Sequence, residues 1–329
     1  MGVLIDGKWS REQLSSAKTG GTFIRAETRF RDVVTADGKP AAGRERGFKA
    51  EPGRYHLYVS HACPWAHRTM IFRALKKLEN VISVSVVHHF MGEDGWTFLA
   101  EDGATGDDLY GLRFLLEIYT KADPAYSGRV TVPVLWDKRE QTIVSNESAE
   151  IIRMLNAAFD EWGDSSLDFY PESLRSEINA VNARVYPAIN NGVYRAGFAM
   201  RQDAYEEAFA DVFSALDEMD VRLGSQRYLT GDRVTEADWR LFTTLVRFDP
   251  VYVGHFKCNL RQIADYPNLS NFTRELFQMP GVAETVNLDH IKRHYYASHE
   301  TINPTRIVPV GPEIDYSLPH DRDRFQKAA

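Results

Sequence analysis

The chain has 329 residues, a net charge of −7 at pH 7 and an isoelectric point of about 5.8. This length suits two domains with cores of their own, and the acidic balance argues against a nucleic-acid or anionic-membrane partner. Hydrophobic residues make up 43% of the chain, as in soluble globular proteins, and no apolar run approaches the roughly 20 residues that span a bilayer.

Only two cysteines are present, Cys63 and Cys258, which excludes a disulfide scaffold and argues against structural zinc. The histidine pairs His88–His89 and His290/His294 do not complete a ligand set, so we predict no metal site. The N-terminus lacks the basic and then apolar pattern of a signal peptide. We therefore expect a cytoplasmic protein with reduced thiols.

The first half of the chain alternates strand and helix patterns. We expect residues 1–50 to form an irregular extension laid over the folded body. Residues 88–128 form a long insertion with one amphipathic helix near 107–121, and long loops are commonly functional. The other expected elements are strands at 55–59, 81–87, 131–136 and 142–144, and helices at 65–78 and 147–159.

This order, β-α-β followed by the insertion and then β-β-α, is the thioredoxin arrangement. It predicts a parallel first pair of strands and an antiparallel second pair within residues 51–165. After residue 170 helical periods dominate, so residues 170–300 are predicted to be all-α. The tail 301–329 is expected to be extended or loosely ordered. The expected helices of the second domain are 172–190, 202–223, 235–248, 257–264, 268–278 and 281–293.

Two side chains at the start of the predicted helix 235–248 indicate how that helix begins. Thr235 and Asp238 have the spacing of a capping box, with an aspartate in place of the usual Glu or Gln. We assign Asp238 this structural role and no chemistry.

Cys63 lies between the first strand and the first helix. Pro64 suits the first turn of a helix, so the thiol is expected at a helix N-terminus, where free N–H groups and the helix dipole favour a thiolate. A dithiol oxidoreductase would have a second cysteine at position 66, where this chain has Ala66. The resolving thiol must therefore come from outside, and glutathione is the abundant small one. A buried, inert cysteine is the alternative.

Three further stretches suit a bound glutathione. Val132 precedes Pro133 at a strand start, where a thioredoxin-like sheet has a cis-proline facing the cysteine and offers free backbone groups to an extended peptide. Glu147 and Ser148 open a helix and can bind the ammonium and carboxylate of the γ-glutamyl group. Arg129 can pair with a carboxylate and Trp96 can cover the ligand. An ordinary strand-start proline, a plain helix cap, an exposed arginine and a packed tryptophan are the respective alternatives.

These residues resemble the glutathione transferase superfamily, and most closely its glutathionyl-hydroquinone reductase branch, the Xi class. The resemblance covers the chain from Asp6 to about Pro312. The motifs that carry it are Cys63-Pro64-Trp65-Ala66-His67-Arg68, Gly95-Trp96-Thr97-Phe98, residues 129–137, Ser145-Asn146-Glu147-Ser148, Asn191-Gly192-Val193-Tyr194, residues 247–252 and residues 289–296.

The resemblance implies a thioredoxin-like domain followed by an all-helical glutathione-transferase domain that binds the second substrate. It also implies reduction of glutathionyl-hydroquinones to hydroquinones through a Cys63–glutathione mixed disulfide. Tyr194 would act as proton donor or acceptor, and Tyr252 and Tyr295 would line the pocket and lower the Cys63 pKa. Glutathione would be a co-substrate without any tightly bound cofactor, and the protein a homodimer. The implied glutathione contacts are Trp96, Arg129, Val130, Thr131, Val132, Glu147 and Ser148.

Two other functions stay open on the sequence. One is an omega-like cysteine glutathione transferase acting on dehydroascorbate or mixed disulfides, which would share Cys63 and the glutathione site. It would differ in the long insertion and the aromatic pocket. The other is a catalytically silent glutathione-binding protein, which the intact Cys63 disfavours.

Overall fold

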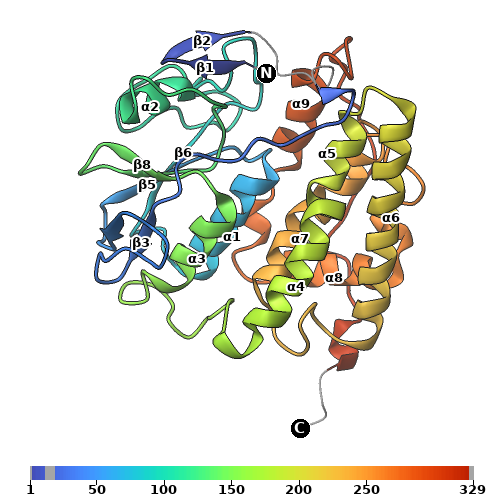
Figure 1. Ribbon diagram of the computed structural model, residues 1–329. Helices are drawn as coiled ribbons and strands as arrows, with labels where there is room; N and C mark the ends of the chain where they lie inside the picture. Colours follow the sequence, from blue (N-terminus) through green and yellow to red (C-terminus); the bar gives the residue numbers. More distant parts are fainter. Residues whose placement is uncertain (1, 12–18, 326–329) are drawn as a thin grey trace. The chain divides into compact units, whose positions relative to one another are not determined.

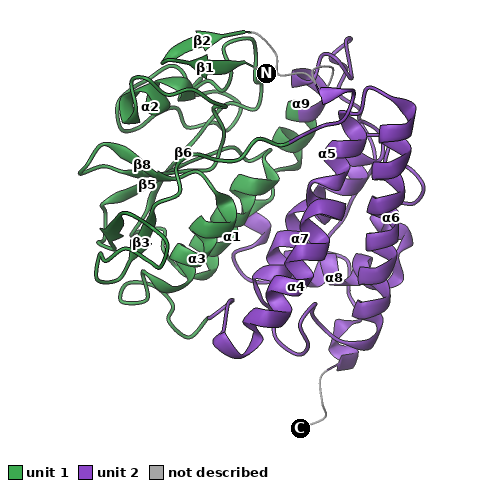
Figure 2. Cartoon of the chain, in the orientation of Figure 1, with its two compact units in different colours: residues 1–14, 25–167, 285–294 green, residues 15–24, 168–284, 295–329 purple. Residues whose placement is uncertain are grey.

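The structure, a computed structural model, describes residues 2–11 and 19–325 (Figure 1). The chain divides into two compact units (Figure 2). Unit 1 comprises residues 1–14, 25–167 and 285–294, and unit 2 comprises residues 15–24, 168–284 and 295–329. Residues 285–294, which the sequence analysis assigned to the helical domain, therefore group with the thioredoxin-like part. The expected extension and tail include residues 1, 12–18 and 326–329, which lie outside the described residues.

A four-stranded mixed sheet forms the centre of unit 1, in the order β6-β5-β7-β8. β5 (Tyr55–Val59) runs parallel to β6 (Ser83–Val86) and antiparallel to β7 (Val134–Asp137), which forms a hairpin with β8 (Thr142–Ser145). All five residues of β5 are buried, as expected for a central strand. Helices α1 (Pro64–Leu75) and α3 (Ser148–Ala157) pack against each other beside this sheet. The predicted thioredoxin arrangement is confirmed.

The predicted helix at 107–121 is wrong in its first half. Helix α2 (Leu115–Ala122) begins only at Leu115. Upstream, the carboxylate of Asp107 accepts hydrogen bonds from the backbone N–H groups of Leu109, Tyr110 and Leu112. An aspartate that bonds nearby N–H groups offers the backbone an alternative to the helical ladder, which explains the turn at this place.

The N-terminal extension lies over the folded body as predicted, but it is less irregular than expected. β1 (Val3–Ile5) and β2 (Lys8–Ser10) form a hairpin, and β3 (Val33–Thr35) pairs in parallel with β4 (Gly47–Lys49). Leu4 exchanges backbone hydrogen bonds with Gly128, and the Asp32 N–H donates to the Val144 carbonyl at 3.0 Å. These bonds join the extension to the insertion and to the sheet.

Unit 2 is all-α in the described residues, as predicted. The last residues of α9 (Leu288–Ser298) belong to this unit, whereas its first residues belong to unit 1. π-helical turns continue α4 and α7. The other helices are α4 (Arg175–Val185), α5 (Gly192–Gly197), α6 (Gln202–Ser225), α7 (Glu236–Arg247) and α8 (Pro267–Gln278).

Two helix predictions in this half need correction. The segment 257–264 forms no α-helix and contributes only to a 3₁₀ turn, Ile263–Asp265. α9 begins at Leu288 rather than near 281, after a separate 3₁₀ turn at Ala283–Thr285. Asp249 accounts for part of the first difference, since its carboxylate accepts from the N–H groups of Ile263 and Ala264.

The predicted cap of α7 is confirmed. Asp238 accepts from the Thr235 N–H at 2.7 Å and from the Leu229 N–H at 2.8 Å. Asp238 is fully buried, and burial raises the pKa of its carboxyl to about 6. The side chain thus joins the start of the helix to the preceding turn.

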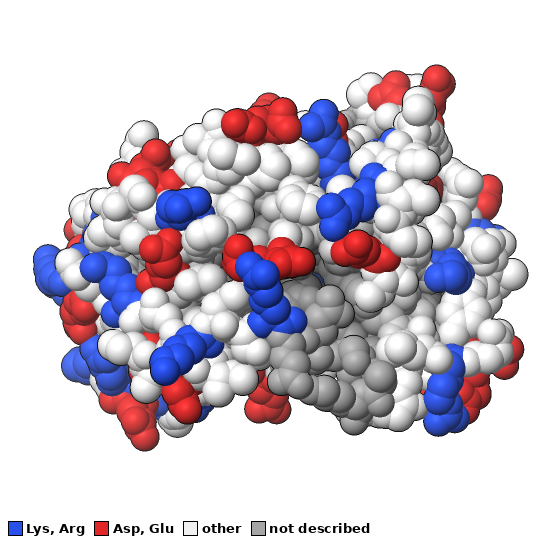
Figure 3. All heavy atoms as spheres, turned by 90° about the horizontal axis from the view of Figure 1, so that it is seen from above, with Lys and Arg blue, Asp and Glu red and all other residues white. Residues whose placement is uncertain are grey.

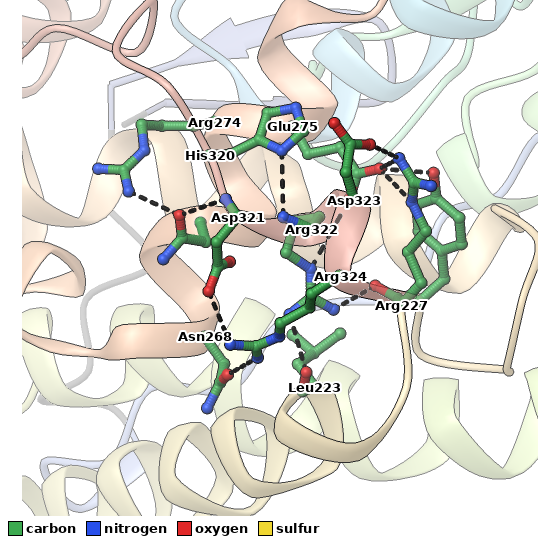
Figure 4. A network of polar contacts seen from close by, with 12 residues as sticks. Leu223, Arg227, Asn268, Arg274, Glu275, His320, Asp321, Arg322, Asp323 and Arg324 are labelled. Carbon is green, nitrogen blue, oxygen red and sulfur yellow. Dashed lines mark hydrogen bonds and ion pairs between the residues drawn. The ribbon is translucent and has the colours of Figure 1, made fainter. Parts of the chain in front are cut away.

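Most of the described C-terminal tail has no regular secondary structure, in line with the expectation of an extended segment, but it is anchored rather than loosely ordered. Arg322 is fully buried and donates hydrogen bonds to the carbonyl groups of Leu223, Gln226 and Arg227, at the end of α6 (Figure 4). The carbonyl groups of a last helical turn lack intrahelical partners. One arginine from the tail therefore completes the C-terminus of the longest helix in unit 2.

No helix of the described residues is long and apolar enough to cross a membrane. On the face seen in Figure 3, basic and acidic side chains of the described residues are interspersed. Such a mixture is unlike the basic stripe of a nucleic-acid-binding surface.

Candidate active site

Cys63 is the N-cap residue of α1, with Pro64 in the first turn, as the sequence predicts. Its carbonyl accepts from the His67 N–H at 2.9 Å, which starts the helical ladder. The thiol sulfur lies 3.6 Å from the carbonyl oxygen of Val132, and the side chain is half-buried. The thiol is thus held at the positive end of a helix while remaining open to a partner.

The strand start opposite the thiol has the predicted backbone. The peptide bond between Val132 and Pro133 is cis. Val132 is buried, and its N–H group makes no backbone hydrogen bond within the described residues. Thr131 is held by Tyr119, whose hydroxyl donates to the Thr131 carbonyl at 2.8 Å. A fixed strand end with a free N–H group suits pairing with an extended peptide.

Arg129 lies one residue before the buried Val130 and is half-buried itself. Burial, and then the positive charge of Arg25, lower the pKa of its guanidinium. No acidic side chain among the described residues forms an ion pair with Arg129. A half-buried cation without a carboxylate partner is a favourable place for an anionic ligand group.

The start of α3 carries the second predicted group of contacts. Glu147 is the N-cap, and its carboxylate accepts from the Ala149 N–H at 3.1 Å and from the Thr28 hydroxyl at 3.3 Å. Ser148 follows as the first helical residue, and its hydroxyl accepts from the Arg68 guanidinium at 3.4 Å. One carboxylate and several N–H groups therefore meet at one helix end, which suits a ligand that carries both an ammonium and a carboxylate.

Sequence reasoning missed the arginines that surround Trp65. The guanidinium carbon of Arg25 lies 4.8 Å from the Trp65 ring centroid and that of Arg68 lies 4.7 Å from it. Arg68 belongs to the Cys-Pro-Trp-Ala-His-Arg motif, so its position near Cys63 could be predicted from the sequence. Arg25 comes from the N-terminal extension, and no local pattern in the sequence connects it to residues 40 positions away.

Trp96 lies in the insertion and is buried to 7% exposure. Its ring stacks on that of His294 with a centroid distance of 4.7 Å and an interplanar angle of 22°. The sequence predicted Trp96 as a glutathione cover but gave no role to His294.

Unit 2 brings the three predicted tyrosines together. The Tyr295 hydroxyl lies 2.5 Å from the Tyr194 hydroxyl and 3.1 Å from the Tyr252 hydroxyl. Burial first, and then the neighbouring Tyr194, raise the pKa of Tyr252 and Tyr295 well above the usual value, whereas the positive charge of Arg247 opposes the shift. Tyr252 and Tyr295 are therefore neutral phenols that can donate hydrogen bonds.

The structure also joins histidines that the sequence analysis left apart. Side-chain atoms of His88, His89 and Asp102 lie within 4.8 Å of one another. The His88 Nδ1 atom accepts from the Phe90 N–H at 3.1 Å, so the proton of the neutral ring lies on Nε2, which faces Asp102. Arg293 donates to the same carboxylate at 3.0 Å. A protonated nitrogen and a competing cation fit a hydrogen-bonded cluster better than a ligand set, and the absence of a metal stays a prediction.

Comparison with known proteins identifies the family. Residues 62–158 match the glutathione S-transferase N-terminal domain, and residues 202–275 match the glutathione S-transferase C-terminal domain. The chain belongs to the glutathione S-transferase superfamily, and the predicted fold class is confirmed.

Within that superfamily the chain belongs to the Xi class, the glutathionyl-hydroquinone reductase family. It is 58% identical to the glutathionyl-hydroquinone reductase YqjG of Escherichia coli, over 98% of this chain and 99% of the relative. It is 55% identical to the glutathionyl-hydroquinone reductase PcpF of Sphingobium chlorophenolicum, over 95% and 96%. The glutathione-bound structure of YqjG superposes with a TM-score of 0.91 at 57% identity, covering 98% of this chain and 99% of that one.

Proposed function

We propose that this protein reduces glutathionyl-hydroquinones to hydroquinones, with glutathione as the reductant. The observation that carries the proposal is the Cys63 thiol at the start of α1, beside the backbone of Val132 and with Ala66 in place of a second cysteine. Family membership supports the substrate class, because two relatives that cover nearly the whole chain carry this activity in their names.

Glutathione is proposed to bind unit 1 through groups at three places. The Val132 backbone pairs with its cysteinyl part, and Arg129 pairs with a carboxylate. Glu147 and the N-terminus of α3 bind the ammonium and carboxylate of the γ-glutamyl group. The proposed contacts are Trp96, Arg129, Val130, Thr131, Val132, Glu147 and Ser148. The glutathione-bound structure of YqjG supports glutathione as the ligand.

The reaction has two steps. The Cys63 thiolate attacks the sulfur of the glutathionyl group, an S–S bond forms, and the bond between that sulfur and the ring carbon breaks. The electron pair stays with the ring carbon, which takes up a proton and leaves as hydroquinone. A second glutathione then attacks the Cys63 mixed disulfide, which releases glutathione disulfide and restores the thiolate. The two glutathionyl sulfurs thus supply both electrons, and the scheme needs no resident cofactor.

Tyr194 is proposed as the donor of the proton to the ring carbon, with Tyr295 and Tyr252 as hydrogen-bonding partners. That Tyr252 and Tyr295 also lower the Cys63 pKa is proposed on the resemblance alone. The support is the chain of three hydroxyls, in which each hydrogen bond polarises the next. Phe198 stacks on the Tyr194 ring and Phe256 meets it edge to face, which gives the cluster an aromatic wall suited to a quinol.

The test is product analysis by mass spectrometry with glutathionyl-benzohydroquinone and glutathione. Hydroquinone and glutathione disulfide should appear in equal amounts, and Cys63→Ala should lower the rate by at least about 1,000-fold. Cys258→Ala is the matched control and should retain the rate, because this thiol is fully buried. Full activity of Cys63→Ala would refute the mechanism.

A cytoplasmic location and a homodimer complete the proposal. The location rests on the need for reduced glutathione and on Cys63 and Cys258, which form no disulfide. The dimer rests on the resemblance alone.

A further inference from the structure

The orientation of the Trp96 ring is set by neighbours that are not among the proposed glutathione contacts. Its backbone is held in unit 1, where its carbonyl accepts from the Leu115 N–H at 3.0 Å. Its indole N–H has no hydrogen-bond partner within the described residues. A buried tryptophan usually finds a partner for this group, so the free N–H is available to a ligand. The direction in which this N–H group points depends on the plane of the indole ring.

The part of α9 that belongs to unit 1 supplies that plane through His294. The His294 ring lies almost parallel to the indole, at a centroid distance of 4.7 Å and an angle of 22°. The His294 Nδ1 atom lies 2.9 Å from the carbonyl oxygen of His89. Because a carbonyl only accepts, the proton of the ring is on Nδ1, and the ring cannot turn without breaking this bond.

The helix itself is tied to the insertion that carries Trp96. Asp102 lies in that insertion, with a φ of 51°. Its carboxylate accepts from Arg293 at 3.0 Å and bonds His89 at 3.2 Å, and its carbonyl bonds the His290 ring at 2.5 Å. Hydrogen bonding to His89, and then the nearby positive charge of Arg293, lower the pKa of the Asp102 carboxyl, so it is ionised at neutral pH. These contacts fix the distance between the helix and the insertion.

We propose that His294 is a positioning residue of the glutathione site, whose ring holds the indole of Trp96 in the plane that glutathione requires. This role rests on the proposed function, since it concerns the same ligand. It adds a residue from the C-terminal part of the chain to a site otherwise built from residues 63–148.

Three substitutions at His294 distinguish the effect of the ring from the effect of its hydrogen bond. His294→Phe keeps a flat ring and loses the N–H donor, His294→Gln keeps an N–H donor and loses the ring, and His294→Ala loses both. The measurements are calorimetric binding of glutathione to the full-length chain and the steady-state constants. We expect His294→Ala and His294→Gln to raise both the dissociation constant and the KM for glutathione about tenfold, with kcat at saturating glutathione changed less than about twofold. His294→Phe should stay within about threefold of the unsubstituted chain.

Glu300→Ala, exposed just beyond the end of the same helix and paired with Arg306, is the control and should bind glutathione normally. His294→Phe that binds as weakly as His294→Ala overturns the proposal, and so does His294→Ala that binds as tightly as the unsubstituted chain. If His294→Ala does not fold, the glutathione affinities of His294→Phe and His294→Gln decide the question. Equal affinities of these two variants refute the role of the ring. An unsubstituted chain that fails to bind glutathione would instead refute the proposed function.

Discussion

At the scale of single residues, the two cysteines show how position decides reactivity. Cys63 caps a helix and is half-buried, whereas Cys258 is fully buried and burial raises the pKa of its thiol to about 12. Since only thiolates attack disulfides or thioethers, the chain has one thiol suited to catalysis. Because Ala66 stands where a dithiol oxidoreductase has its second cysteine, the enzyme depends on glutathione for turnover.

Tyr194 gives a residue-level test of proton transfer. Tyr194→Phe removes the hydroxyl that lies 2.5 Å from that of Tyr295. Only the departure of the ring carbon requires this proton, so kcat with glutathionyl-benzohydroquinone should fall on the order of 100-fold. Reduction of a simple glutathione mixed disulfide should fall less than about threefold.

The control for Tyr194 is Tyr205→Phe, which removes another unit 2 hydroxyl that donates to the Lys257 carbonyl. Its rates should match those of the unsubstituted chain with both substrates. Equal losses with both substrates in Tyr194→Phe would remove this residue from the proton-transfer step.

Asp238 gives a residue-level test of stability against pH. Its carboxyl has a pKa of about 6 in the folded chain, above its ordinary value of 3.8, because burial outweighs the hydrogen bonds that the carboxylate accepts. The folded state therefore binds the proton more tightly than the unfolded state, and the stability from this group is fully present below the unfolded pKa. It is lost as the pH rises through about 6.

The measurement is the free energy of unfolding of the chain and of Asp238→Asn, by urea titration between pH 4 and pH 7. The advantage of the aspartate over the asparagine should shrink by up to about 3 kcal/mol as the pH rises. A difference that stays constant, or that grows with pH, would contradict the assignment.

At the scale of elements, the sequence predicted the helices and strands that have local sequence signals. The strands β5 to β8, helices α1 and α3 and the cap at Thr235 follow from hydrophobic periodicity and capping residues. The failures come from side chains that bond the backbone across a turn. Asp107 ends the expected helix at 107–121, and Asp249 holds the segment expected to be helical at 257–264. Periodicity does not reveal such bonds.

The end of α6 gives the prediction at this scale. Arg322→Ala would leave the carbonyl groups of Leu223, Gln226 and Arg227 without this donor, and Glu275, 3.7 Å from Arg322, with Arg227 as its remaining cationic partner. Leaving buried acceptors unsatisfied is costly, so the free energy of unfolding should fall by about 2–4 kcal/mol. The midpoint of urea unfolding, followed by circular dichroism, measures this loss.

Arg324→Ala is the matched control, two residues along the same 3₁₀ turn. Its side chain is 43% exposed and pairs with Asp321 on the surface, so its loss should cost less than about 1 kcal/mol. Equal midpoints for the two variants would show that the tail does not stabilise the helix.

At the scale of the whole molecule, the candidate site depends on contacts between residues distant in the chain. The stacking of Trp96 on His294 and the meeting of Tyr194 with Tyr295 join segments that no local pattern connects. The residue types were predicted from the motifs, but the bonds between them were not. Helix α9 is divided between the two units at His294 and Tyr295, so neighbouring residues of one helix take part in different clusters.

A single turnover without free glutathione tests the central claim most directly. The reduced chain is mixed with one equivalent of glutathionyl-benzohydroquinone, and the protein and the small molecules are analysed by mass spectrometry. We predict one hydroquinone released for each chain and one glutathionyl group attached to Cys63, which added glutathione removes as glutathione disulfide. Release of hydroquinone with Cys63 unmodified, or no release at all, would contradict the account.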